Sequence, residues 1–310
     1  MAFAFGAAIS WVLAWTAAAP LGPHGPGEAV ASAPTAPPVP AGAASQLLVV
    51  TFASDALASD ASYRAYLPPG YGAPDSAPSP APRYPLVVLL HGLGGQGADW
   101  FDPTRGDLVP TLDHGIASGA LAPLVAIAPD GRNGYWTDHR DGLAGHAYGR
   151  YLDEVVADAE RRFRLRPAAR ALVGVSMGGH GAMLRALREP ERWRAVVSIA
   201  GALFAAPPTH RPIYKEVWGD PPDPAYWAAE SPMGLLAAWP AQRALPPIFL
   251  SCGAEDTERF LDLTLGAETR LVALGARPPV VITPGAHTWT AWRAATPRWL
   301  PWLEAQLVRP

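Results

Sequence analysis

From residue 45 onwards, short apolar runs alternate along the chain with longer stretches in which apolar residues recur every three to four positions. Short runs bounded by Gly, Pro and polar residues predict β-strands, and the longer periodic stretches predict helices. Strands are expected at eight places: 47–53, 63–67, 86–90, 124–128, 171–175, 195–199, 248–251 and 280–283. This alternation predicts an α/β fold, with a mostly parallel eight-stranded sheet and helices on both of its faces.

Two of the periodic stretches predict helices with definite ends. The first runs over residues 148–164, where Leu152, Val155 and Val156 belong to one apolar stripe with charged residues opposite. The second runs over residues 258–274. Gly275 indicates its end, because glycine is favoured just beyond a helix C-terminus.

The first 44 residues follow a different pattern. Residues 1–19 carry an apolar stretch that ends in three alanines, which is typical of a secretory signal peptide. No Lys or Arg precedes that stretch, so an uncleaved anchor and an incorrect start site are the alternatives. Residues 20–44 are rich in Pro and Ala and predict a disordered linker, which leaves 45–310 as the folded domain. We therefore expect a secreted or periplasmic protein, or a cytoplasmic one if the stretch is no signal, without a membrane span in the mature chain.

Composition removes several classes of function. The chain has 310 residues, of which 49% are hydrophobic and only 16% charged, and its net charge of −3 argues against a nucleic-acid partner. No phosphate-binding glycine motif and no Cys/His cluster with zinc spacing occurs, so we expect neither cofactor nor metal. The single cysteine, Cys252, cannot form an internal disulfide and is expected to be a small buried residue. The sequence predicts no oligomeric state.

One pentapeptide carries the first chemical signal. Gly174-Val175-Ser176-Met177-Gly178 follows an expected strand and precedes a helical stretch. A serine in this pattern occupies a strained strand-to-helix turn that exposes its hydroxyl, and the flanking glycines avoid collisions with neighbouring backbone. Ser176 is therefore a candidate nucleophile.

A glycine-rich loop upstream is expected to lie beside the turn that carries Ser176. The strand at 86–90 leads into His91-Gly92-Leu93-Gly94-Gly95, where an α/β hydrolase places one backbone N–H of its oxyanion hole. We expect the N–H groups of Leu93 and Met177 to bind the negatively charged oxygen of a tetrahedral intermediate.

Two later strands each end near a titratable residue. Asp256 follows the strand at 248–251, and His287 follows the strand at 280–283. A serine hydroxyl needs an imidazole to accept its proton and a carboxylate to orient that imidazole, so Ser176, His287 and Asp256 are predicted to form a catalytic triad. Glu255 remains the alternative acid.

The other histidines are weaker candidates for the base. His91 is expected to fix the glycine loop by hydrogen bonding, and His180 is expected to pack in the helix after Ser176. His139 and His146 lie in the loop after the fourth expected strand, where pocket lining and solvent exposure are both open.

These motifs together resemble the putative-esterase family of α/β hydrolases, which includes feruloyl and tributyrin esterases, S-formylglutathione hydrolases and mycolyltransferases. The matching pieces are 91–95 with 99–100, 174–182, 252–256 and 285–289 with Trp292, spread over residues 47–307. The resemblance implies a serine-dependent carboxylic-ester hydrolase that acts through an acyl-enzyme on a small-molecule or polysaccharide-linked ester. Acyl transfer to a sugar or other alcohol is the alternative, and a non-catalytic binding protein is a more distant one.

Substrate contacts are expected mainly from aromatic side chains. The tryptophan candidates are Trp100, Trp136, Trp218, Trp289 and Trp292, for which packing in the core is the alternative. Asp138 is a further candidate, for which stabilisation of its loop is the alternative. The Pro- and Trp-rich excursion over residues 202–244 is expected to form a cap or a pocket wall.

Overall fold

The computed structural model describes residues 44–72, 82–256 and 259–308. The predicted signal peptide at 1–19, and all but the last residue of the predicted linker at 20–44, lie outside these ranges. Within the described ranges, no helix has both the length and the apolar character that crossing a membrane requires.

All eight expected strands are present and form a single sheet in the order β1-β2-β4-β3-β5-β6-β7-β8. β1 pairs antiparallel with β2, β2 pairs antiparallel with β4, and the remaining neighbours are parallel. The strands are β1 (Gln46–Ser54), β2 (Ser59–Leu67), β3 (Tyr84–Leu90), β4 (Val125–Pro129), β5 (Leu165–Val175), β6 (Ala195–Ile199), β7 (Ile248–Gly253) and β8 (Val280–Thr283). The mostly parallel eight-stranded sheet of the α/β class is thereby confirmed.

Burial along the strands follows their place in the sheet. Every residue of β3, β4 and β6 is buried, because a parallel strand in the middle of the sheet has helices over both faces. β1 lies at the edge, and most of its residues are exposed. The central strands are therefore rigid supports for whatever follows their carboxyl ends.

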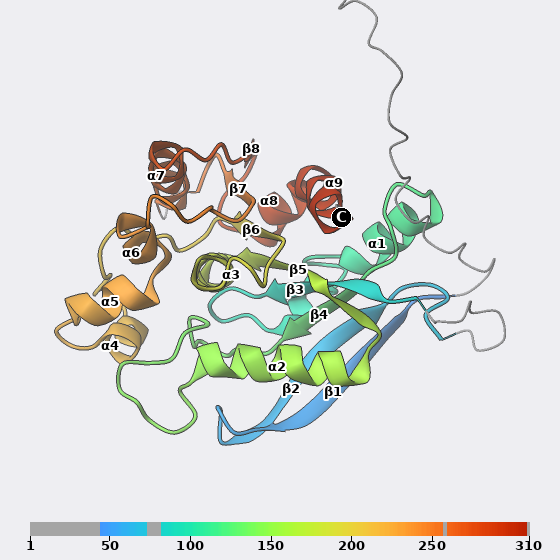
Figure 1. Ribbon diagram of the computed structural model, residues 1–310, viewed down its shortest axis with the longest axis horizontal. Helices are drawn as coiled ribbons and strands as arrows, with labels where there is room; N and C mark the ends of the chain where they lie inside the picture. Colours follow the sequence, from blue (N-terminus) through green and yellow to red (C-terminus); the bar gives the residue numbers. More distant parts are fainter. Residues whose placement is uncertain (1–43, 73–81, 257–258, 309–310) are drawn as a thin grey trace, which may run out of the picture. The chain divides into compact units, whose positions relative to one another are not determined.

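Helices cover both faces of the sheet. Figure 1 shows α1 and α9 on one side and α2 and α3 on the other. The helices are α1 (Leu108–Ala117), α2 (Tyr148–Arg162), α3 (Met177–Arg188), α4 (Pro212–Trp218), α5 (Pro224–Glu230), α6 (Pro232–Ala237), α7 (Phe260–Ala273), α8 (Trp289–Ala294) and α9 (Thr296–Leu307), with a 3₁₀ turn at Gly97–Trp100.

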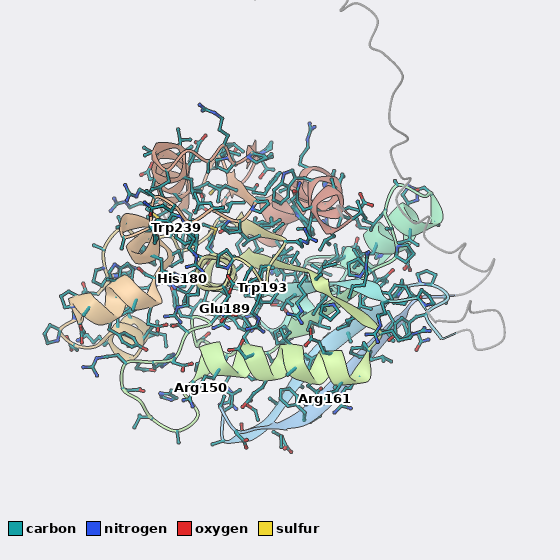
Figure 2. The ribbon with its side chains drawn as sticks, viewed as in Figure 1. Arg150, Arg161, His180, Glu189, Trp193 and Trp239 are labelled. Atoms are coloured by element: carbon teal, nitrogen blue, oxygen red, sulfur yellow. The ribbon has the colours of Figure 1, made fainter. Side chains whose placement is uncertain are left out.

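The two helices predicted from periodicity differ from the structure only at their ends. α2 buries Leu152, Val155 and Val156, while Arg150 and Arg161, labelled in Figure 2, are exposed. It ends at Arg162 because β5 already begins at residue 165. α7 begins at residue 260 and is followed by Gly275 with φ +86°, a conformation that glycine adopts without strain.

Candidate active site

Ser176 lies in the sharp turn between β5 and α3. Its φ of 55° and ψ of −117° are an unfavourable conformation for a residue with a side chain, and the fold holds it there. Its N–H donates to the carbonyl of Ile199, and its own carbonyl accepts from the N–H groups of His180 and Ala202. These backbone bonds fix the turn on both sides and leave the hydroxyl free to point away from the sheet.

The neighbouring glycines allow this turn to lie against other backbone. A Cβ at Gly174 would come within 2.0 Å of the Gly178 carbonyl oxygen, and a Cβ at Gly178 within 2.1 Å of the Leu90 carbonyl oxygen. Both distances are far inside van der Waals contact. Glycine is therefore required at Gly174 because β5 lies close to the start of α3, and at Gly178 because α3 lies close to the end of β3.

The structure brings Ser176, His287 and Asp256 together from three strand ends. His287 Nε2 lies 2.9 Å from Ser176 Oγ, and His287 Nδ1 lies 2.7 Å from Asp256 Oδ2. The Asp256 side chain is fully buried, whereas Glu255 is exposed. A carboxylate accepts a proton donated by Nδ1, so Nε2 is left with the lone pair that can accept the serine proton.

Aromatic side chains fix the plane of the imidazole. Phe260, the first residue of α7, stacks on the His287 ring with 4.0 Å between ring centroids. Trp292 of α8 meets the same ring edge-on at 4.9 Å. The ring is thus oriented by packing as well as by its hydrogen bond to Asp256.

The glycine loop after β3 lies directly against the nucleophile turn. A Cβ at Gly92 would be 3.2 Å from Ser176 Cβ, and Leu93 lines the same pocket as Ser176. Met177 is the first residue of α3, so its N–H has no acceptor within the helix. The backbones of Leu93 and Met177 therefore lie beside Ser176.

His91 anchors this loop and lies away from the serine. Its Nε2 accepts from the Gly131 N–H at 3.0 Å, so Nδ1 carries the proton and donates to the Gly92 carbonyl at 2.8 Å. Burial lowers the pKa of His91, which keeps the ring neutral. The expectation that this histidine fixes the loop agrees with these contacts.

A pocket of about 930 Å³ contains Ser176 and His287 in its wall. Four large aromatic side chains in the wall were not among the residues singled out from sequence: Tyr135, Phe204, Tyr214 and Phe260. Phe204 and Tyr214 belong to the excursion at 202–244, whose first part lines the pocket as expected. The sequence signals for the other two are weak. Tyr135 is the neighbour of the candidate Trp136, and Phe260 lies four residues after Asp256.

Of the residues expected to contact substrate, Trp292 lines this pocket, and the other five do not. Trp136 and Trp218 are fully buried in the core. Trp136 packs against Gly181 of α3. Trp218 packs among three aromatic rings, those of Tyr135, Tyr214 and Trp227. Trp100 is buried against the edge of the half-buried Trp289.

Asp138 has the structural role that was the alternative for it. Its Oδ1 accepts from the N–H groups of Gly149 and Arg150 in the first turn of α2, and its Oδ2 pairs with the Arg150 guanidinium at 2.9 Å. A carboxylate at a helix N-terminus satisfies amides that have no acceptor within the helix. Asp138 therefore stabilises its loop.

The remaining histidine candidates also lie outside the pocket that holds Ser176. His180, labelled in Figure 2, is fully buried, its Nδ1 lies 3.1 Å from the Ala202 carbonyl, and burial lowers its pKa to about 4. His139 is buried and His146 is half-buried. Cys252 is buried at the end of β7, with its Sγ 3.8 Å from Asp256 Oδ2.

Comparisons with known proteins find relatives both in sequence and in structure. In sequence, an endo-1,4-beta-xylanase/feruloyl esterase of Xylanibacter ruminicola is 25% identical over an alignment of 252 residues that covers 79% of this chain. The chain spans only 29% of the length of that relative.

Solved structures show the same fold. FphF, a fluorophosphonate-binding serine hydrolase of Staphylococcus aureus, superposes with a TM-score of 0.71 at 18% identity, covering 84% of this chain and 99% of that one. The S-formylglutathione hydrolase FrmB of the same organism gives a TM-score of 0.66 at 19% identity with the same coverage. These identities are low, so the likeness concerns the fold.

The family assignment rests on the sequence itself. The family model described as "Putative esterase" matches residues 54–303, a segment that begins in β1, ends in α9 and includes Ser176, Asp256 and His287. The matched solved structures share the overall fold of this sheet and its helices. The chain therefore belongs to the Putative esterase family and has the fold of the α/β-hydrolase esterases.

Proposed function

We propose that the protein is a serine-dependent carboxylic-ester hydrolase in which Ser176 is the nucleophile, His287 the general base and acid, and Asp256 the residue that orients the imidazole. The observation that carries this proposal is the unbroken hydrogen-bond chain, 2.9 Å from Ser176 Oγ to His287 Nε2 and 2.7 Å from His287 Nδ1 to Asp256 Oδ2. Membership of an esterase family supports it independently.

The reaction proceeds in two halves. Ser176 Oγ attacks the ester carbonyl carbon while His287 Nε2 takes the hydroxyl proton, and the carbonyl oxygen becomes negatively charged. The N–H groups of Leu93 and Met177 stabilise that oxyanion. When the intermediate collapses, His287 gives its proton to the leaving alcohol, and water then hydrolyses the acyl-enzyme by the same steps with the same base.

The pocket wall supports an aromatic acyl group as the substrate. Phe204, Tyr214 and Trp292 provide flat apolar surface beside the catalytic residues, and aromatic rings pack favourably against each other in edge or offset arrangements. The curated relative from Xylanibacter ruminicola is named in part a feruloyl esterase. We therefore propose hydroxycinnamoyl or similar aryl esters, free or linked to polysaccharide, as the substrate class.

Replacing Ser176 by alanine tests the nucleophile. We expect Ser176→Ala to lower kcat for p-nitrophenyl butyrate and methyl ferulate by roughly 10⁶-fold, the order of loss seen when a triad serine is removed elsewhere. Wild type should be labelled by a fluorophosphonate, and the variant should not. Ser118→Ala, at the exposed end of α1, is the matched control and should behave as wild type.

Two outcomes of this experiment would contradict the proposal. The first is full activity in Ser176→Ala, and the second is a wild type that neither hydrolyses any ester of the panel nor reacts with the fluorophosphonate. Product analysis with an acceptor alcohol present separates hydrolysis from acyl transfer, because transfer yields a new ester in place of the free acid.

A further inference from the structure

Three potential metal ligands lie together in the connection between β4 and α2. His139, Asp141 and His146 each offer one ligand atom, and the three atoms all lie within 4.8 Å of one another. His146 Nδ1 is 2.8 Å from Asp141 Oδ2, and the two imidazole rings have centroids 5.0 Å apart. None of the three residues lines the pocket that contains Ser176.

His139 has a buried ring nitrogen that makes no hydrogen bond to the described residues. Its Nδ1 is shielded from solvent and has no hydrogen-bond partner among the described residues. Its Nε2 lies 3.3 Å from the Gly134 carbonyl, so Nε2 carries the proton and Nδ1 keeps its lone pair. A histidine that donates from one nitrogen to a backbone carbonyl and presents the other unpaired has the arrangement typical of metal-binding histidines.

The loop that carries the three residues is held in place by backbone bonds. The His139 N–H donates to the His146 carbonyl at 2.9 Å, which closes the segment between them. The Arg140 N–H donates to the Val217 carbonyl in α4, and Asp138 fixes the start of α2 beside it. Gly142 and Gly145 have φ of +63° and +85°, which allow the tight turn between the ligands. The ligands are therefore positioned by the fold itself.

We propose that His139, Asp141 and His146 bind a divalent transition-metal ion, with zinc as the best match. Two imidazole nitrogens and one carboxylate oxygen are a donor set that Zn²⁺ favours, and they leave a fourth tetrahedral position for water. Tetrahedral ligands about 2.0–2.2 Å from zinc are roughly 3.4 Å apart, so small side-chain rotations close the site. The ion would cross-link the β4–α2 connection, which also contributes Tyr135 to the pocket wall.

The spacing of the three ligands matches no common zinc motif, because one residue separates His139 from Asp141 and four separate Asp141 from His146. The site is independent of the proposed catalytic residues. Its test therefore measures metal binding and needs no ester substrate.

The test uses the untagged full-length protein after treatment with a chelator and dialysis. Titration with Zn²⁺ by calorimetry, and with Co²⁺ by visible absorption, should give one equivalent bound and the intense bands of tetrahedral cobalt. Asp141→Asn and His146→Gln alter exposed or half-buried side chains, so both variants should fold. Each should weaken the affinity at least tenfold, and the zinc-induced rise in Tm should shrink accordingly.

His114→Gln is the matched control, because His114 is an exposed histidine of α1 outside this cluster. It should bind Zn²⁺ as wild type does. The proposal is overturned if wild type binds no Zn²⁺ below millimolar concentration, or if Asp141→Asn and His146→Gln bind it as tightly as wild type, since the ion would then be held elsewhere.

Discussion

Asp256 and Glu255 are neighbours in the sequence, and the chain places them in opposite environments. Asp256 is buried with one carboxylate oxygen 2.7 Å from His287 Nδ1, while Glu255 faces solvent. The Glu255 N–H donates to the Gly285 carbonyl, so backbone pairing with the loop that carries His287 turns one acid inwards and the other outwards. Two residues that chemistry alone leaves equivalent are thus distinguished by the loop conformation.

Exchanging these two acids for amides tests that distinction. Asp256→Asn should lower kcat by roughly 10⁴-fold, because an amide in this place favours the wrong imidazole tautomer while preserving the packing. Glu255→Gln should leave kcat within about twofold of wild type. Steady-state kinetics on p-nitrophenyl butyrate gives both values, and a larger loss in Glu255→Gln than in Asp256→Asn would identify Glu255 as the acid.

At the scale of elements, α3 is the helix that connects Ser176 to the rest of the fold. It packs on β5 and β6 through its glycine-rich first turn. At its other end, the Arg188 guanidinium pairs with Glu230 of α5, and Glu230 also accepts from the Thr137 hydroxyl in the β4–α2 connection. Through these contacts, α3 connects Ser176 with the excursion at 202–244 and with the β4–α2 connection.

Because backbone atoms approach closely at the start of α3, two glycine substitutions are expected to differ strongly in their effect on the free energy of unfolding. Gly178→Ala would place a Cβ 2.1 Å from the Leu90 carbonyl oxygen, and should lower the free energy of unfolding by about 1–3 kcal/mol along with the ester activity. Gly266→Ala lies in an exposed position of α7 with open space around it, and should stabilise the protein by about 0.5–1 kcal/mol. Urea unfolding measures both, and equal effects would contradict the packing account.

The sequence allowed the elements to be predicted better than the pocket. The run at 86–90 is apolar throughout because its strand is buried on both faces, so its pattern and its structure have the same cause. Residues 165–170 were missed as part of β5, since they are Arg- and Pro-containing and pair irregularly with β3. The three proposed catalytic residues, Ser176, Asp256 and His287, could be named because each follows a strand.

The residues that line the pocket could not be predicted from the sequence, for a physical reason. Trp136 and Trp218 are as suited to a core as to a substrate contact, and only the tertiary packing decides between the two. Tyr135 and Tyr214 line the pocket beside these buried rings. Composition of a loop does not show which of two adjacent aromatic side chains faces inwards.

At the scale of the whole molecule, buried neutral histidines make stability depend on pH. Burial lowers the pKa of His180 to about 4, below the ordinary value of 6.5. Between these values the unfolded chain binds a proton that the folded chain does not, so the free energy of unfolding falls as pH falls through this window. The slope is about 1.4 kcal/mol per pH unit for each such histidine.

Unfolding by urea between pH 4.5 and 7.5 tests this dependence on metal-free protein. His180→Asn keeps a donor for the Ala202 carbonyl but cannot titrate, so it should be less stable than wild type at pH 7 and lose less stability on acidification. His114→Gln should keep the slope of wild type. An unchanged slope in His180→Asn would show that this residue does not contribute to acid sensitivity.

The hydrogen bond between Ser176 and His287 joins residues 111 positions apart in the chain. At a translation rate of roughly 5–20 residues per second, the ribosome adds the histidine about 6 to 22 s after the serine. During that interval a nascent chain has a serine at its turn but no base to activate it. Esterolytic activity is therefore expected only after β8 has joined the sheet and brought His287 beside Ser176.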